Sequence, residues 1–184
     1  MSQKEIDEIY NQLDANVDYA EQIAKQTVNT NTEPLDNLMA EIYDKIIAVE
    51  DPATSDIEKY FLALSNCLYF LGDKLEKIGL YDDLSKAQAK EKYNSAYMDS
   101  VNPSDAKKKV TVAEAQTSAE NASTYENMVN TIYARSYKMF RYKIDAAQTM
   151  LSSLSKMLSK RMQDAQMSMT TRDGSKQYLV EGVL

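Results

Sequence analysis

The chain has 184 residues, a formal net charge of −7, no His, no Trp, one Cys, four Gly and three Pro. Scarce Gly and Pro among abundant helix formers indicate an all-α fold, and the length suits one domain or two small units that share a core. The absence of His removes the usual general base and the commonest transition-metal ligand. We therefore expect a non-enzymatic protein with neither a cofactor nor a metal site.

Cys67 lies in the apolar run 60–71 and is expected to fill the core. A single Cys forms no disulfide within the chain, which indicates a reducing compartment. The N-terminal residues lack the basic and apolar regions of a secretory signal. The longest apolar run is about twelve residues, too short to cross a bilayer. These features predict a cytoplasmic protein that does not enter membranes.

The charge is unevenly distributed along the chain. Residues 1–60 carry 14 acids and 4 bases, a net of −10, whereas residues 61–184 carry 14 acids and 17 bases, a net of +3. Between 127 and 163, seven bases stand against Asp145 alone. Such segregation favours either a surface that binds polyanions or self-association of acidic and basic surfaces.

Two amphipathic helices are predicted in the acidic part. Apolar residues recur at intervals of three and four over 4–28, and the polar run 29–32 is expected to end that helix. Thr32 is a candidate cap for a second helix, with Pro34 in its first turn, where the missing N–H costs little. The second helix is expected to stop at Asp51-Pro52.

From about residue 55 the sequence predicts an apolar helix, which a more polar helix follows. Ser55 and Glu58 form a candidate capping box at its start. Gly72 is expected to kink this helix and Gly79 to end it. A further helix, rich in Lys and Ala, is predicted over 82–98.

The sequence predicts a long C-terminal helix. Residues 99–105 break the pattern, Thr111 and Glu114 form a second candidate capping box, and no Gly or Pro occurs from 104 to 173. An apolar seam with steps of three and four then comprises Val129, Tyr133, Tyr137, Phe140, Ile144, Ala147, Leu151, Leu154 and Leu158. This spacing is typical of a coiled coil or long bundle and implies a helix on the order of 75 Å in length.

The predicted organisation is therefore an acidic helical bundle over 1–99, a basic linker over 100–110, the long helix over 111–167 and a flexible tail over 168–184. The seam is expected to pack partly on the chain's own helices and partly on another subunit. The residues assigned to oligomerisation are Val129, Tyr133, Phe140, Ile144, Leu151, Leu154 and Leu158.

The segment Tyr133–Lys143 contains four aromatic residues and four cations in eleven positions. On a helix its apolar members join the seam, whereas Arg135, Lys138 and Tyr142 share the opposite side. An exposed tyrosine among cations can stack a base while its neighbours neutralise phosphates. The alternative is an ordinary core stripe with a solvated charged face.

Further candidate contacts with nucleic acid precede this segment. Lys86, Lys90 and Tyr93 share one helical side, Lys92 lies between them in sequence, and the linker adds a run of three lysines. A surface helix with solvated lysines explains the same pattern. The candidate nucleic-acid-binding residues are Lys86, Lys90, Lys92, Tyr93, Lys107, Lys108, Lys109, Arg135, Lys138 and Tyr142.

Over roughly residues 84–165 the order of these features resembles the phage recombination mediator proteins of the UvsY-like family. The matching elements are the Lys/Ala-rich segment 86–97 ending in Tyr, an irregular charged loop, the helix start at Thr111-Val-Ala-Glu-Ala, and the long amphipathic helix with an aromatic middle. The resemblance implies a homo-oligomer in the host cytoplasm. It also implies binding of single-stranded DNA and loading of a RecA-like recombinase onto strands covered by single-strand-binding protein, with Lys86, Lys90, Lys92 and Tyr93 in the DNA-contacting segment.

Two other function classes remain open at this point. One is an oligomeric helical scaffold or virion assembly protein that binds no nucleic acid. The other is an acidic inhibitor that mimics DNA, suggested by the net charge of residues 1–60.

Overall fold

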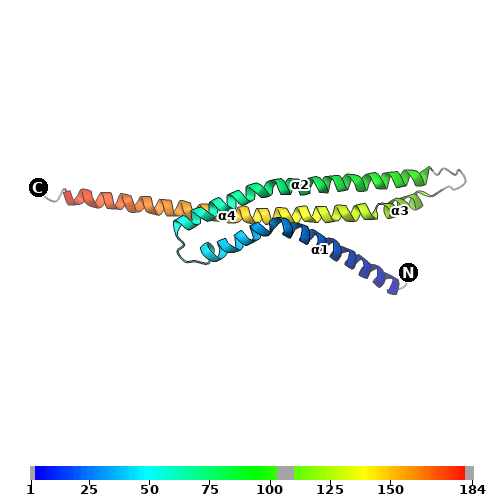
Figure 1. Ribbon diagram of the computed structural model, residues 1–184, viewed down its shortest axis with the longest axis horizontal. Coiled ribbons are helices and arrows are strands. Elements are labelled where there is room, and N and C mark those ends of the chain that lie inside the picture. Colours follow the sequence, from blue (N-terminus) through cyan, green and yellow to red (C-terminus); the bar gives the residue numbers. More distant parts are fainter. Residues whose placement is uncertain (1–2, 103–109, 181–184) are drawn as a thin grey trace. The chain divides into compact units, whose positions relative to one another are not determined.

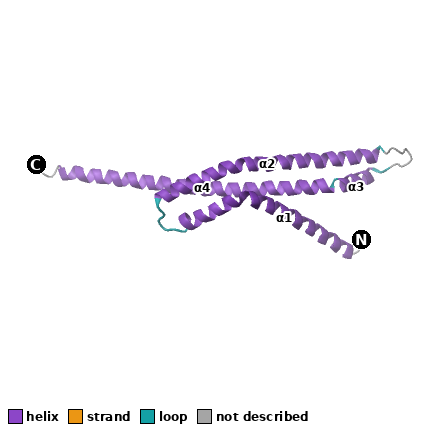
Figure 2. Cartoon of the chain, in the orientation of Figure 1, coloured by secondary structure: helices purple, strands orange, loops and turns teal. Residues whose placement is uncertain are grey.

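The computed structural model describes residues 3–102 and 110–180, with side chains described over 17–102 and 110–169. These residues form helices and no strand, which confirms the all-α prediction (Figures 1 and 2). The helices in chain order are α1 (Gln3–Ile42), the π-helix η1 (Tyr43–Ile47), α2 (Thr54–Val101), α3 (Val112–Ala122) and α4 (Thr124–Val180).

α1 continues through the break that the polar run predicted, with Pro34 inside it. Side chains of this run bond back to the helix itself: Thr30 donates to the Gln26 carbonyl at 2.9 Å and Asn31 to the Thr27 carbonyl at 2.8 Å. Such bonds satisfy the polar groups without interrupting the helix. Burial of apolar side chains on both sides of the proline, including Leu35, offsets the missing N–H.

The turn after α1 falls where Asp51-Pro52 predicted it. η1 ends with a hydrogen bond of 2.8 Å from the Ala48 N–H to the Tyr43 carbonyl. α2 then begins at Thr54, so Ser55 lies inside the helix and the predicted Ser55–Glu58 cap is wrong.

α2 runs unbroken to Val101, so the predicted end of the helix at Gly79 is wrong. A glycine inside a helix costs only about 1 kcal/mol relative to alanine, which packing readily offsets. At Gly79 that packing is visible: a Cβ there would lie 3.2 Å from Cε2 of Tyr137. Because Gly79 has no Cβ, the ring of Tyr137 can lie close to the backbone of α2.

The second predicted capping box is confirmed at the start of α3. The Glu114 N–H donates to the Thr111 hydroxyl at 3.3 Å, and the Thr111 N–H donates to the Glu114 carboxylate at 2.9 Å. The Glu114 carboxylate accepts bonds from the Thr111 N–H and, at 3.0 Å, from the Thr111 hydroxyl, and these two bonds hold the pKa of Glu114 below its usual value. One break was not predicted: buried Ser123 separates α3 from α4, with its N–H on the Ala119 carbonyl.

α4 spans 57 residues, which confirms the long C-terminal helix. It continues to Val180, whereas the sequence predicted a flexible tail from residue 168.

Two compact units divide the contacts of the chain. The first comprises Met1–Thr32 with Leu71–Lys143, and the second comprises Glu33–Phe70 with Ile144–Leu184. This grouping differs from the linear division at residues 99 and 111, because segments distant in sequence pair with one another. Each unit draws on α1, α2 and α4.

In the first unit α2 and α4 lie side by side (Figure 1). The contacts Gly79–Tyr137, Tyr81–Tyr133 and Asp82–Asn130 show that they run antiparallel. Asn130 ties them by donating at 3.2 Å to both the carbonyl and the carboxylate of Asp82 and to the hydroxyl of Ser85. The buried side chains of this unit include Ala20, Ala24, Val28, Ile78, Ser85, Ala89, Ala115, Ala119, Ser136 and Phe140.

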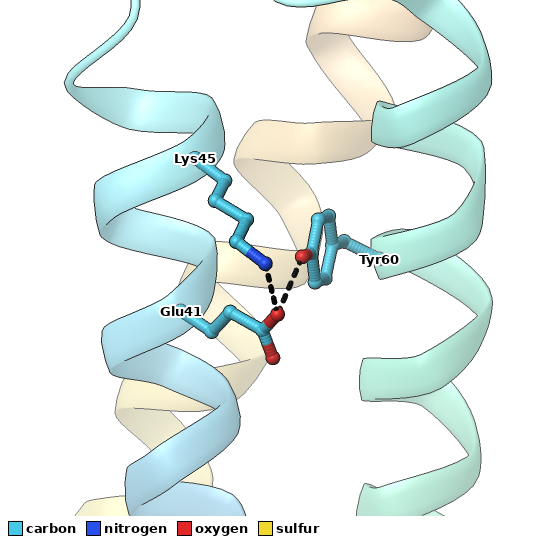
Figure 3. A network of polar contacts seen from close by, with 3 residues as sticks. All are labelled: Glu41, Lys45 and Tyr60. Carbon is cyan, nitrogen blue, oxygen red and sulfur yellow. Dashed lines mark hydrogen bonds and ion pairs between the residues drawn. The ribbon is translucent and has the colours of Figure 1, made fainter.

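The second unit encloses a core of aliphatic side chains beside one polar network (Figure 3). Glu41 Oε1 accepts hydrogen bonds from Lys45 Nζ at 2.6 Å and from Tyr60 Oη at 2.8 Å, which joins α1, η1 and α2. The bonds from Lys45 and Tyr60 lower the pKa of Glu41, and the bond to Glu41 raises the pKa of Tyr60. The buried apolar residues are Leu35, Ile42, Ile46, Ile57, Tyr60, Leu64, Ile144, Ala147 and Leu154.

Candidate nucleic-acid interface

The aromatic side chains of segment 133–143 mostly serve the core of the first unit. Tyr133 packs on Tyr81 with ring centroids 5.3 Å apart, Tyr137 lies against Gly79, and Phe140 is fully buried. These contacts agree with the helical projection of the segment, which placed Tyr133, Tyr137 and Phe140 in the apolar seam.

Two cations of the same segment contact α1. Arg135 lies 3.8 Å from Glu21, whose pKa is lowered mainly by Lys25 and to a smaller extent by Arg135. Lys143 donates to the Thr32 hydroxyl at 2.8 Å and to Asn29 at 3.2 Å. Arg135 was a candidate for a ligand, but its guanidinium already has a carboxylate neighbour.

Lys138 and Tyr142 remain on the outer surface of α4. Both are exposed, Tyr142 to 76%, and they are four positions apart in sequence, so they are neighbours on the helix. This pair keeps the combination of a cation and an accessible ring that the sequence suggested.

On α2, two of the predicted contacts share one side of the helix. Lys86 and Lys90 are exposed and one turn apart, and neither makes an ion pair with any residue that the structure describes. Tyr93 lies further along the same side and is half-buried. A half-buried Tyr97 follows it, with ring centroids 6.4 Å apart and an interplanar angle of 9°.

Lys92 belongs to a different surface. At about 100° per residue it points some 120° away from Lys86. It lines a groove of about 420 Å³ that also contains Glu91, Glu126 and Tyr125, and in the described part of the chain Glu126 Oε2 is buried without a hydrogen-bond partner. Lys92 therefore does not share the surface on which Lys86 and Lys90 lie.

The three lysines of the predicted linker, Lys107, Lys108 and Lys109, lie outside the described residues.

The seam residues assigned to oligomerisation fall into two groups. Phe140, Ile144 and Leu154 are buried by the chain's own helices, so they act in intramolecular packing. The remaining four are half-buried, and they are Val129, Tyr133, Leu151 and Leu158.

Sequence reasoning missed an exposed aromatic pair in the apolar run 60–71. Tyr69 is 78% exposed and Phe70 69%, and their rings meet edge to face at 5.5 Å. A helical projection of residues 60–71 would have identified part of this exposed surface, because Leu62 and Tyr69 lie on the side of the helix opposite the buried Leu64.

A charged cavity of about 560 Å³ in the second unit was also not predicted. Its Arg161 is held by Asp51, with Nη2 2.5 Å from Oδ1, and donates to the Thr54 hydroxyl at 3.1 Å. Because Asp51 neutralises this guanidinium and Asp164 lies nearby, the cavity is not a strong anion site.

Among the described residues, no three His, Cys, Asp or Glu side chains gather closely enough to hold a metal ion. Within the same part of the chain, none of the helices has a stretch long and apolar enough to pass through a membrane.

Scans of protein-family models, of curated proteins and of solved structures found nothing that matches this chain.

Proposed function

We propose that this protein is a non-enzymatic accessory protein that binds single-stranded DNA through α2. The observation that carries the proposal is the pair Lys86 and Lys90, exposed on one side of the helix, unpaired among the described residues and followed there by tyrosines. Lysines without an acidic partner can neutralise phosphates, and adjacent rings can stack bases without reading sequence.

The net charge of −7 opposes this binding only weakly at the site itself. Exposed charges more than about 10 Å apart are largely screened at 0.1 M salt, so acidic residues far from this part of α2 weaken the attraction little. The acidic residues within about one turn of the two lysines are Asp82, Asp83 and Glu91. Weak binding per chain gains strength if several copies engage one strand.

The resemblance over residues 84–165 extends the proposal to a recombination mediator. In that role the protein delivers a RecA-like recombinase to strands occupied by single-strand-binding protein. Faster recombinase assembly on such covered strands, in the presence of this protein, is the measurement that tests the loading step.

The DNA-binding step is tested by fluorescence anisotropy with a labelled 40-nucleotide oligo-dT at low salt. We expect K86Q/K90Q to weaken binding and to reduce the slope of log K against log salt by about 1.4, since each lost phosphate contact removes about 0.7. The matched control is K156Q/K160Q, which removes two exposed lysines with the same spacing on α4. Equal losses in both variants, or no binding by the unaltered protein, would refute the proposal.

A second candidate function, an oligomeric helical scaffold, is favoured by the far part of α4. The apolar stepping continues past Leu158 through Met162, Ala165 and Met169, and the two methionines are 64% and 71% exposed. An apolar stripe of this kind on a helix commonly pairs with another helix. Sedimentation at micromolar concentration is the test, and a monomer would exclude the scaffold.

A further inference from the structure

The tyrosine pair of α2 has a geometry suited to a planar partner. Tyr93 and Tyr97 are nearly parallel, with an interplanar angle of 9° and centroids 6.4 Å apart. Facing carbon atoms in contact lie about 3.5 to 4.0 Å apart, so neither ring fully covers the face of the other. Both side chains are also only half-buried, which leaves part of each ring accessible.

The pair lies at the edge of the packed face of α2. The fully packed positions of this stretch are small, Ser85 and Ala89, whereas the tyrosines fall to one side of them. Two large rings at this edge leave part of their surface facing solvent.

The lysines are arranged in register with the rings. Lys86 precedes Tyr93 by seven residues and Lys90 precedes Tyr97 by seven, so each cation stands two turns before a ring on the same side. The four side chains therefore follow one line along α2, with both cations at one end and both rings at the other.

We propose that Tyr93 and Tyr97 form a base-stacking platform that holds unpaired nucleotides, while Lys86 and Lys90 contact the phosphates of the same strand. This inference rests on the proposed DNA binding and specifies how the bases are held. Base faces are accessible in single strands and occupied by neighbours in a duplex, so the platform selects single strands. Stacking requires only a π face, so all four bases are accepted.

The test uses the full chain and two probes: labelled oligo-dT and a phosphodeoxyribose strand of equal length without bases. The unaltered protein is expected to bind oligo-dT about tenfold or more tightly than the abasic strand, in line with base–aromatic stacking energies. Y93L/Y97L should lose that preference and keep the salt slope, because both lysines remain. Y93F/Y97F should bind like the unaltered protein, because the rings remain.

The matched control is Y43L/Y69L, which replaces two exposed tyrosines of the second unit and should change nothing. Circular dichroism shows whether each variant folds, and the comparison of the two strands with the unaltered protein needs no variant at all. Equal affinity of that protein for both strands, or full oligo-dT binding by Y93L/Y97L, overturns the platform. If the platform is overturned but K86Q/K90Q still weakens binding, the proposed DNA binding stands without base stacking by Tyr93 and Tyr97. If the unaltered protein binds neither strand, both the platform and the proposed DNA binding are refuted.

Discussion

Replacing each of the two glycines of α2 by alanine should have different effects on stability, although both lie inside the same helix. A Cβ added at Gly72 meets nothing within 4 Å, so Gly72→Ala gains helix propensity alone. We expect it to stabilise the protein by about 0.5–1 kcal/mol, which raises Tm by roughly 2–4 °C per kcal/mol for a chain of this size.

At Gly79 the same methyl group would lie 3.2 Å from Cε2 and 3.6 Å from Cδ2 of Tyr137. Accommodating it requires the ring to shift within a packed contact between α2 and α4, and such overpacking costs about 1–3 kcal/mol. The propensity gain is therefore cancelled, and Gly79→Ala should be no more stable than the unaltered protein.

The assay is urea denaturation followed by circular dichroism at 222 nm, with both substitutions repeated in a Tyr137→Ala background. Without the ring, Gly79→Ala should recover the gain seen at Gly72, giving a coupling energy of about 0.5–3 kcal/mol. Equal stabilisation by both alanines in the unaltered background would show that Tyr137 does not rest on Gly79.

Three further predictions concern polar contacts. Asn130→Ala removes the bridge from α4 to α2 and leaves the buried Ser85 with one fewer partner, so unfolding free energy measured in urea should fall by about 1–3 kcal/mol; an unchanged midpoint would contradict the bridge. The lowered pKa of Glu41 means that its ionised form stabilises the fold above its usual pKa of 4.5, a contribution lost as the pH falls through the lowered value. Tyr60→Phe should therefore flatten the decline of Tm on acidification below pH 4.5, and an unaltered Tm–pH curve would argue against this bond. Thr111→Ala should weaken the start of α3 by about 1 kcal/mol, seen as faster amide hydrogen exchange in its first turn and not in α4.

The helical character of the chain and its long C-terminal helix followed from local features. Few helix breakers, apolar spacing of three and four, and the Thr111–Glu114 box act within a few residues of one another, so they can be recognised without knowing the fold. The same reasoning overestimated Gly79 and the polar run before Pro34 as helix breakers, because each costs its helix little compared with the packing that surrounds it.

The candidate interface could be predicted in part. Lys86, Lys90 and Tyr93 were identified by their common side on a helix, and that property depends only on sequence spacing. Lys92 was included as part of the basic segment 86–97, and Arg135 for its side of the long helix. An acidic residue of another helix lies near each of them, because Glu126 lines the same groove as Lys92 and Glu21 is 3.8 Å from Arg135. An acidic neighbour from a distant segment changes the electrostatic surroundings of a cation, and the spacing of residues along the sequence does not predict such a neighbour.

The amino-acid sequence was thus sufficient for the helices and for which side of each helix is apolar, because both depend on interactions between residues close along the chain. The pairing of 71–143 with the start of α1, and of 33–70 with the end of α4, depended on the folded structure. The first pairing includes the hydrogen bond from Lys143 to Thr32, and the second includes the ion pair of Arg161 with Asp51, each between partners more than 100 residues apart. Within 71–143, α2 and α4 meet through contacts such as Gly79–Tyr137 and Asp82–Asn130, in which partners about 50 residues apart fit by shape and hydrogen bonding. In the same packed unit Lys86 and Lys90 are exposed, whereas Phe140 is buried and Tyr133 and Tyr137 are half-buried.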